Sequence, residues 1–164
     1  MITIYTDGSG VNNPKNKHYQ LGGYGVYIKD RDKEYYLSKG YSHTTTNRME
    51  IRAVLYALKA IKDKSQKVLI YSDSQYVINS IMLDWINKWY SQGWNCKNSD
   101  LWKRMIEELN RFRKAKGSVV LKHIKGHQTN LEDPHVFGNN VVDALASYKN
   151  FSKYKVDKGN INSF

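Results

Sequence analysis

Short bursts of alternating apolar and polar residues, separated by glycines, run through the first third of the chain, and this period of two is typical of β-strands. Three bursts cover residues 2–6, 23–28 and 34–40. The stretch from Gly8 to Gln20, between the first two bursts, is rich in turn-forming residues and is predicted to be a loop. The simplest arrangement of these strands is a meander.

From Asn47 the apolar period changes to three and four residues, which predicts an amphipathic helix. Its apolar stripe consists of Ile51, Val54, Leu55, Leu58 and Ile61. Asn47 is the expected cap, with Glu50 three residues later as in a capping box. Residues 67–71 form a short β-rich run, and Asp73 or Ser74 is expected to open a second helix.

The second half of the chain continues this alternation of strands and helices. Residues 85–102 contain all four tryptophans and a glycine break, and they predict a short helix and a turn. Ser99 or Asp100 is expected to cap the next helix, followed by a strand over residues 118–124. A polar loop then leads to a last helix over residues 139–149. The whole pattern predicts one α/β domain with a mixed sheet covered by helices.

The chain is strongly basic, because 26 basic and 15 acidic residues leave a formal net charge of +11. This charge favours polyanionic partners. The single cysteine, Cys96, excludes an internal disulfide and fits a reducing compartment. Apolar runs such as residues 68–71 fall far short of the ~20 residues that cross a bilayer, so we expect no membrane span. No basic segment leads into an apolar stretch at the start, so we expect no secretory signal and a cytoplasmic protein. Separately, we expect the protein to be a monomer.

Four carboxylates stand near elements that are predicted to be buried. Asp7 directly follows the first strand and Asp73 comes two residues after a later one, and the carboxyl ends of strands are where sites gather in open α/β sheets. Glu50 falls in the first turn of its helix, and Asp143 lies in apolar company in the last helix. Taken singly, each has a structural alternative as a turn residue, a helix cap, a capping-box partner or a surface position.

The combination of local motifs is more specific than any single acid. Five motifs follow one another along the chain: Asp7-Gly8-Ser9, Asn47-Arg48-Met49-Glu50, Tyr71-Ser72-Asp73-Ser74, Gly126-His127, and Gly138-Asn139 followed by Asp143. Together they resemble the type 1 ribonuclease H family closely, from Thr3 to about Ala146. The resemblance implies a ribonuclease H-like α/β fold, a five-stranded mixed sheet whose first three strands are antiparallel, flanked by helices.

The resemblance also implies a division of the chain. A catalytic domain would cover residues 1–150, with a handle-like segment at about residues 82–100. A polar, basic C-terminal tail would follow over residues 151–164.

Four converging carboxylates repel one another unless cations neutralise them. Mg²⁺ suits an all-oxygen site, and two such ions can promote an in-line phosphodiester displacement; Mn²⁺ is the alternative. The resemblance implies that Asp7 bridges both ions, that Glu50 and Asp73 serve the ion beside the leaving oxygen, and that Asp143 serves the ion carrying the attacking water. It also implies that His127 assists proton movement and product departure, whereas the other histidines are expected to be surface or packing residues.

Residues that contact the hybrid are implied by the same resemblance. Those expected near the backbone or 2′-hydroxyls are Ser9, Asn13, Asn47 and Gln75, with Arg48 near the strand beyond the cleavage point. Those expected to grip the DNA strand, in the handle-like segment, are Trp85, Lys88, Trp89, Trp94 and Lys97. The structural alternatives are turn and cap chemistry for the first group, and packing of the handle onto the body for the tryptophans.

The chain departs from the family pattern at several places. Thr46 replaces an asparagine frequent before the catalytic glutamate, and Asn140 replaces a glutamate usual in the last helix. Residues 15–21 are longer than the family's compact turn, and residues 131–137 differ from its usual pattern. All four metal-binding positions nonetheless hold carboxylates.

The leading hypothesis is therefore a divalent-metal endoribonuclease that hydrolyses the RNA strand of RNA–DNA hybrids and leaves 5′-phosphate and 3′-hydroxyl ends. A DNA nuclease built on the same sheet is one alternative, and a hybrid-binding module without catalysis is another.

Overall fold

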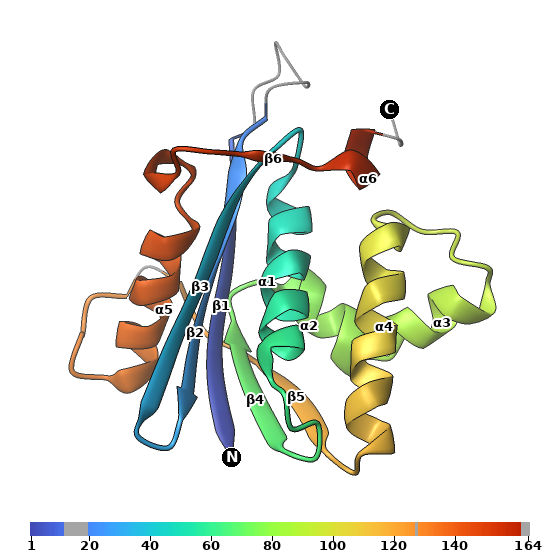
Figure 1. Ribbon diagram of the computed structural model, residues 1–164, viewed down its shortest axis with the longest axis horizontal. Coiled ribbons are helices and arrows are strands. Elements are labelled where there is room, and N and C mark those ends of the chain that lie inside the picture. Colours follow the sequence, from blue (N-terminus) through green and yellow to red (C-terminus); the bar gives the residue numbers. More distant parts are fainter. Residues whose placement is uncertain (12–19, 127, 162–164) are drawn as a thin grey trace.

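The computed structural model describes residues 1–11, 20–126 and 128–161, which form a mixed sheet with helices on both faces (Figure 1). The strands are β1 (Ile2–Gly10), β2 (Gly22–Asp30), β3 (Lys33–Ser42), β4 (Lys67–Ser72), β5 (Ser118–His123) and β6 (Lys155–Val156). The helices are α1 (Thr46–Ala60), α2 (Gln75–Met82), α3 (Trp85–Ser91), α4 (Ser99–Lys114), α5 (Pro134–Ala146) and α6 (Lys158–Ile161), and a 3₁₀ turn covers Tyr148–Asn150. Within the described ranges, no helix combines the length and the apolar character needed to cross a membrane.

The sheet confirms the predicted α/β class. Its strand order is β5-β4-β1-β2-β3-β6, with an antiparallel meander of β1, β2 and β3 and parallel pairing of β4 to β1 and of β5 to β4. The expected strand count of five is one too low, because β6 pairs in parallel with Tyr41 and Ser42 at the end of β3. A strand of two residues carries no readable alternation, so its sequence does not reveal it.

Successive residues of β1 face two different cores, because side chains alternate across a strand. Ile4 belongs to the main core, which lies on the side of α1 and α4 and includes the fully buried Trp102. Tyr5 belongs to a smaller cluster with Tyr27, Ile124 and Val142 on the side of α5. Figure 1 shows α5 on one face of the sheet and α1 on the other, with α4 packed on the outer side of α1.

Three helices begin at residues other than those expected, and the N-cap of α4 is Asn98, so neither Ser99 nor Asp100 is the cap. The cap of α1 is Thr45, whose Oγ1 accepts a hydrogen bond from the Arg48 backbone N at 3.2 Å, so Asn47 is not the cap. α5 begins at Pro134, five residues before the expected start, because the Asp133 carboxylate caps the helix by accepting from the His135 backbone N at 2.9 Å. Proline fits the first helical position, since its missing N–H has no intrahelical partner there.

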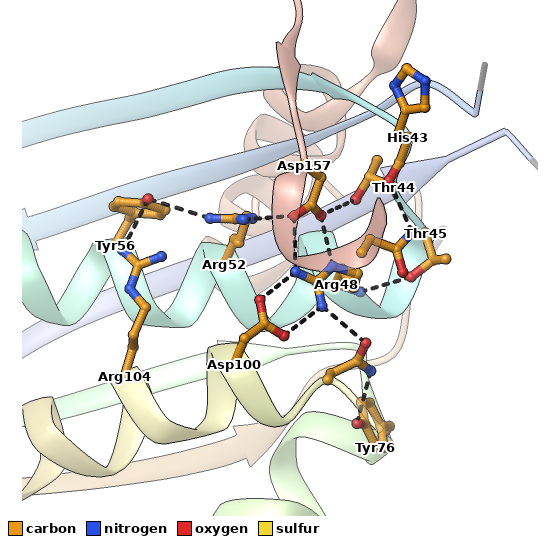
Figure 2. Close-up of polar contacts among 12 residues, drawn as sticks. His43, Thr44, Thr45, Arg48, Arg52, Tyr56, Tyr76, Asp100, Arg104 and Asp157 are labelled. Carbon is orange, nitrogen blue, oxygen red and sulfur yellow. Dashed lines mark hydrogen bonds and ion pairs between the residues drawn. The ribbon is translucent and has the colours of Figure 1, made fainter. Parts of the chain in front are cut away.

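The tail beyond residue 150 packs onto the body of the protein (Figure 2). Asp157, directly after β6, is fully buried, and its carboxylate accepts hydrogen bonds from Thr44 Oγ1 at 2.9 Å, Arg48 Nε at 2.7 Å and Arg52 Nη2 at 2.8 Å. The Arg48 guanidinium also donates to both carboxylate oxygens of Asp100, at 2.9 and 2.7 Å. Arg48 therefore joins α1, α4 and the tail in one buried ionic network.

Removing the Asp157 carboxylate should strongly destabilise the protein. We expect Asp157→Ala to lower the free energy of unfolding by about 3–5 kcal/mol, because it leaves the buried Arg52 without its carboxylate partner and Arg48 with Asp100 alone. Although burial alone raises the pKa of Asp157, hydrogen bonds from Arg48 and charge from Arg52 bring it below its ordinary value. The contribution is therefore present at neutral pH and lost only as strong acid protonates the folded state.

Urea denaturation at neutral pH measures this destabilisation. The matched control is Asp32→Ala, which removes an exposed carboxylate and should change stability by less than about 0.5 kcal/mol. Equal destabilisation of the two variants would show that the buried network does not stabilise the fold.

Candidate active site

Three carboxylates from three different elements converge at one end of the sheet. Asp7 lies in β1, Glu50 in α1, and Asp73 directly follows β4. One carboxylate oxygen from each lies within 4.8 Å of the other two. β1 and β4 pair in parallel with Tyr5 opposite Tyr71, so Asp7 and Asp73 each lie two residues beyond this pair and reach the same level.

Glu50 reaches this cluster because α1 lies unusually close to β1. A Cβ atom added to Gly8 would fall 2.3 Å from the Glu50 backbone N, a separation that no side chain could occupy. Glycine at position 8 therefore allows the helix backbone to rest directly on the strand, next to Asp7. This contact brings a helix-borne carboxylate to the two strand-borne ones.

Asp143 approaches the cluster from the opposite face of the sheet. It is exposed on α5, and it lies close enough to Asp7 to raise the pKa of the Asp7 carboxyl through its charge and a side-chain hydrogen bond. The four carboxylates expected from the sequence thus gather around Asp7.

Burial and mutual repulsion make it energetically unfavourable for all of these carboxylates to be ionised without a cation. Burial, followed by the charge of Asp73, raises the pKa of Asp7 to about 8. Burial, followed by the charges of Asp7 and Asp73, raises the pKa of Glu50 well above its ordinary value. In addition, Glu50 Oε2 is a buried acceptor for which no described residue supplies a donor.

These features fit a divalent cation. The donors are all oxygens, as hard cations such as Mg²⁺ prefer, and a bound cation would both balance the charge and satisfy the buried acceptor. The cluster can therefore hold metal through Asp7, Glu50 and Asp73, with Asp143 beside them.

The family of the chain follows from its sequence. The sequence model of the RNase H family matches residues 1–150. The chain belongs to the ribonuclease H family. Ribonuclease H of Desulforamulus reducens is 41% identical over 135 residues, which is 79% of this chain and 80% of that protein. Ribonuclease HI of Vibrio parahaemolyticus is 37% identical over 151 residues, 88% of this chain and 86% of that protein.

Solved structures of the ribonuclease H family share the fold. The solution structure of the PFV RNase H domain is 27% identical, with a TM-score of 0.69 over 88% of this chain and 91% of that domain. Asp7, Glu50 and Asp73 lie in the motifs that resemble this family, and the same three residues form the oxygen cluster.

Three of the residues expected to contact the hybrid lie two or three positions along the chain from a site carboxylate. Asn47 is exposed in the first turn of α1, and Gln75 is exposed at the first position of α2. Ser9 lies in β1, and its hydroxyl donates to the Ala146 carbonyl at the end of α5. Asn13 and His127 lie outside the described residues, and all these roles stay predictions.

Arg48 has a clear structural function besides the role expected from the sequence. It is 1% exposed, and its guanidinium is held by Asp100 and Asp157 (Figure 2). Sequence reasoning missed both carboxylate partners, because neither a first-turn aspartate nor a lone aspartate in a polar tail signals a buried ion pair. Its contact with substrate stays a prediction.

The handle-like segment divides into packed and exposed residues. Trp89 and Trp94 are partly buried against the main core, and the Trp89 ring lies 5.6 Å from that of Trp102. Trp85 is 39% exposed. Lys88 and Lys97 are exposed as well. The packing alternative thus applies to Trp89 and Trp94, while the other three side chains face outward.

The carboxylate cluster should make the metal-free protein less stable as the pH rises. The folded state holds a proton on Asp7 up to a pH of about 8, whereas the unfolded chain releases it near the ordinary value of 3.8, so stability falls between these two values. We expect Asp7→Asn to stabilise the chelator-treated protein by more than about 1 kcal/mol at pH 8 and to flatten this profile.

Urea denaturation in chelator, at pH 5 and pH 8, measures the effect, with Asp32→Asn as the exposed control. Adding a divalent cation should stabilise the wild type more than the Asp7→Asn variant. If the free energy of unfolding depends on pH in the same way in both proteins, the pKa of Asp7 is not raised in the folded state.

Proposed function

We propose that this protein is a divalent-metal-dependent endoribonuclease that hydrolyses the RNA strand of RNA–DNA hybrids and leaves 5′-phosphate and 3′-hydroxyl ends. The observation that carries the proposal is the buried, oxygen-only cluster of Asp7, Glu50 and Asp73 in a chain of the ribonuclease H family. The names of the curated relatives support the same reaction.

Each carboxylate has a role in this proposal. Asp7, which neighbours the other three, would hold both cations; Glu50 and Asp73 would hold the one on the leaving-group side, and Asp143 would hold the one on the side of the attacking water. When bound, two such ions supply an activated water and stabilisation of the leaving oxygen. The protein's own contribution is to hold the four carboxylates together against their repulsion, with Mg²⁺ as the proposed metal because it prefers oxygen ligands.

The surface supports a polyanionic substrate. The net charge of +11 attracts nucleic acid, while the acidic cluster marks the place where the backbone is cut. Telling RNA from DNA requires contact with 2′-hydroxyls, for which Asn47 and Gln75 stand exposed at the starts of α1 and α2. We propose that Trp85, Lys88 and Lys97, which are exposed on the handle-like segment, contact the DNA strand.

Assembly and location are part of the same proposal. One chain supplies all four carboxylates, so the reaction needs no second copy, and we propose that the protein acts as a monomer. The lone, partly buried Cys96 suits a reducing compartment, which supports the cytoplasm as its location.

Replacing Asp7 should separate catalysis from binding. We expect Asp7→Asn to lower the rate of hybrid cleavage by more than about 100-fold, since even the loss of an outer partner of a metal ligand costs 10- to 100-fold. Hybrid affinity, measured by fluorescence anisotropy, should change little. The control is Asp32→Asn.

The same cleavage assay includes DNA duplex and double-stranded RNA, with and without chelator. Unchanged cleavage by Asp7→Asn would remove the catalytic role of that residue. DNA duplex cut as fast as hybrid would favour the DNA nuclease, and binding without any metal-dependent cleavage would favour the hybrid-binding module.

The handle lysines should affect substrate affinity more than turnover. We expect Lys88→Ala combined with Lys97→Ala to raise KM more than it lowers kcat, and to reduce the slope of log affinity against log salt by about one for each phosphate that a lysine no longer neutralises. The matched control combines Lys62→Ala and Lys67→Ala. These two exposed lysines lie just after α1 and at the start of β4, at the ends of the two elements that are far from the carboxylate cluster. A fall in kcat at constant KM would place the handle lysines outside the binding surface.

A further inference from the structure

α5 meets one face of β1 at three successive positions. Tyr5, Asp7 and Ser9 point to the same side of the strand, because they are two residues apart. Tyr5 lies under Gly138, where an added Cβ would fall 2.6 Å from the tyrosine ring. Asp7 interacts with Asp143, and the Ser9 hydroxyl donates to the Ala146 carbonyl.

The first two of these contacts have similar spacing along the strand and along the helix. From Tyr5 to Asp7 the strand advances by about 7 Å, and from Gly138 to Asp143 the helix advances by about 7.5 Å. The contact between Gly138 and Tyr5 therefore sets the level at which Asp143 stands beside Asp7. A shift of α5 along β1 would separate the two carboxylates.

The first of the three contacts is extended by an aromatic group that links three elements. The Tyr5 hydroxyl and His135 Nδ1 share a hydrogen bond of 2.9 Å. The Tyr71 ring stacks on Tyr5, with centroids 5.4 Å apart, and its centroid lies 4.3 Å from that of His135. A phenol hydroxyl can both donate and accept a hydrogen bond, so Tyr5 can bond either histidine tautomer.

Each member of this group lies on an element that carries a site carboxylate or directly precedes one. Tyr5 precedes Asp7 by two residues on β1, and Tyr71 precedes Asp73 by two residues at the end of β4. His135 lies in the first turn of α5, the helix of Asp143.

The start of α5 has few other polar attachments. None of the ion pairs among the described residues involves this helix. The hydrogen bond between His135 and Tyr5 therefore ties the first turn of α5 to β1.

We propose that Tyr5, Tyr71 and His135 form a clamp of positioning residues that fixes α5 along β1 and so holds Asp143 at the level of Asp7. This inference rests on the catalytic role proposed above for Asp143.

Two conservative variants test the clamp. Tyr5→Phe keeps the ring beneath Gly138 but removes the hydroxyl, and His135→Phe keeps a ring on Tyr71 but removes the nitrogen. We expect each to lower kcat for hybrid cleavage about five- to tenfold with KM unchanged, because one hydrogen bond is removed and a ligand is displaced. The double variant should be no slower than either single one, because both remove the same bond.

Hydrogen exchange gives a readout that needs neither metal nor substrate. In Tyr5→Phe, we expect the amides of α5 to exchange about five- to tenfold faster, and those of α1 and α4 to be unchanged. The matched control is Tyr27→Phe. It removes a hydroxyl on β2 that donates a hydrogen bond of 2.6 Å to Glu34 Oε1 on the neighbouring strand β3. This control should alter neither α5 exchange nor kcat.

A double-mutant cycle with Asp143→Asn separates this inference from the proposed function. Tyr5→Phe should cost nothing further in the Asp143→Asn background. Full activity of Asp143→Asn would overturn the role of Asp143, and the function of the clamp with it. If Asp143→Asn is impaired, the clamp alone is overturned by any of three results: an equal effect of Tyr5→Phe in both backgrounds, unchanged α5 exchange, or faster exchange with unchanged kcat.

Discussion

The site depends on forcing like charges together at a point where three elements meet. Asp7, Glu50 and Asp73 would separate in a flexible chain, and only the packing of α1 on β1 and the parallel pairing of β1 with β4 hold them within reach of one another. The free energy gained by packing the main core outweighs this repulsion. The clustered carboxylates should therefore attract cations more strongly than a single carboxylate would. Functional sites of this kind are expected to weaken the fold locally.

α1 has two charged faces with different purposes. Arg48 and Glu50 are two residues apart, which turns them by about 200° around the helix axis. Glu50 faces the acidic cluster, whereas Arg48 is held by Asp100 and Asp157. The ionic network on one side therefore fixes the helix whose other side presents a carboxylate of the acidic cluster. The buried ion pairs of Arg48 thus help to hold Glu50 in the acidic cluster, because both residues lie on the same rigid helix.

The sequence predicts the parts of this fold that repeat a pattern. The strands of the meander and the helices α1, α2 and α4 show clear periods of two or of three to four, and the motifs around Asp7, Glu50 and Asp73 point to residues that the structure brings together. The predicted cap of α1 is wrong because Thr44, Thr45, Thr46 and Asn47 are all residues that commonly cap helices or form turns. The sequence alone does not say which of them the tertiary structure will use.

The missed features depend on contacts between residues far apart in the chain. β6 is too short to show a period, and Asp157 resembles any other acid of a polar segment until Arg48 and Arg52 are seen around it. The early start of α5 is hidden because Pro134 suggests a loop, although Asp133 and Pro134 together form a good helix start. An ion pair between residues far apart in the chain produces no recognisable pattern in the sequence around either residue.

The ionic network also has a consequence for the order in which the protein matures. Asp157 follows Arg48 by 109 residues and Arg52 by 105. While the ribosome is still extending the chain, Arg52 has no carboxylate partner, and Arg48 has only Asp100. The ionic network around α1 can thus be completed only after translation of the segment that carries Asp157.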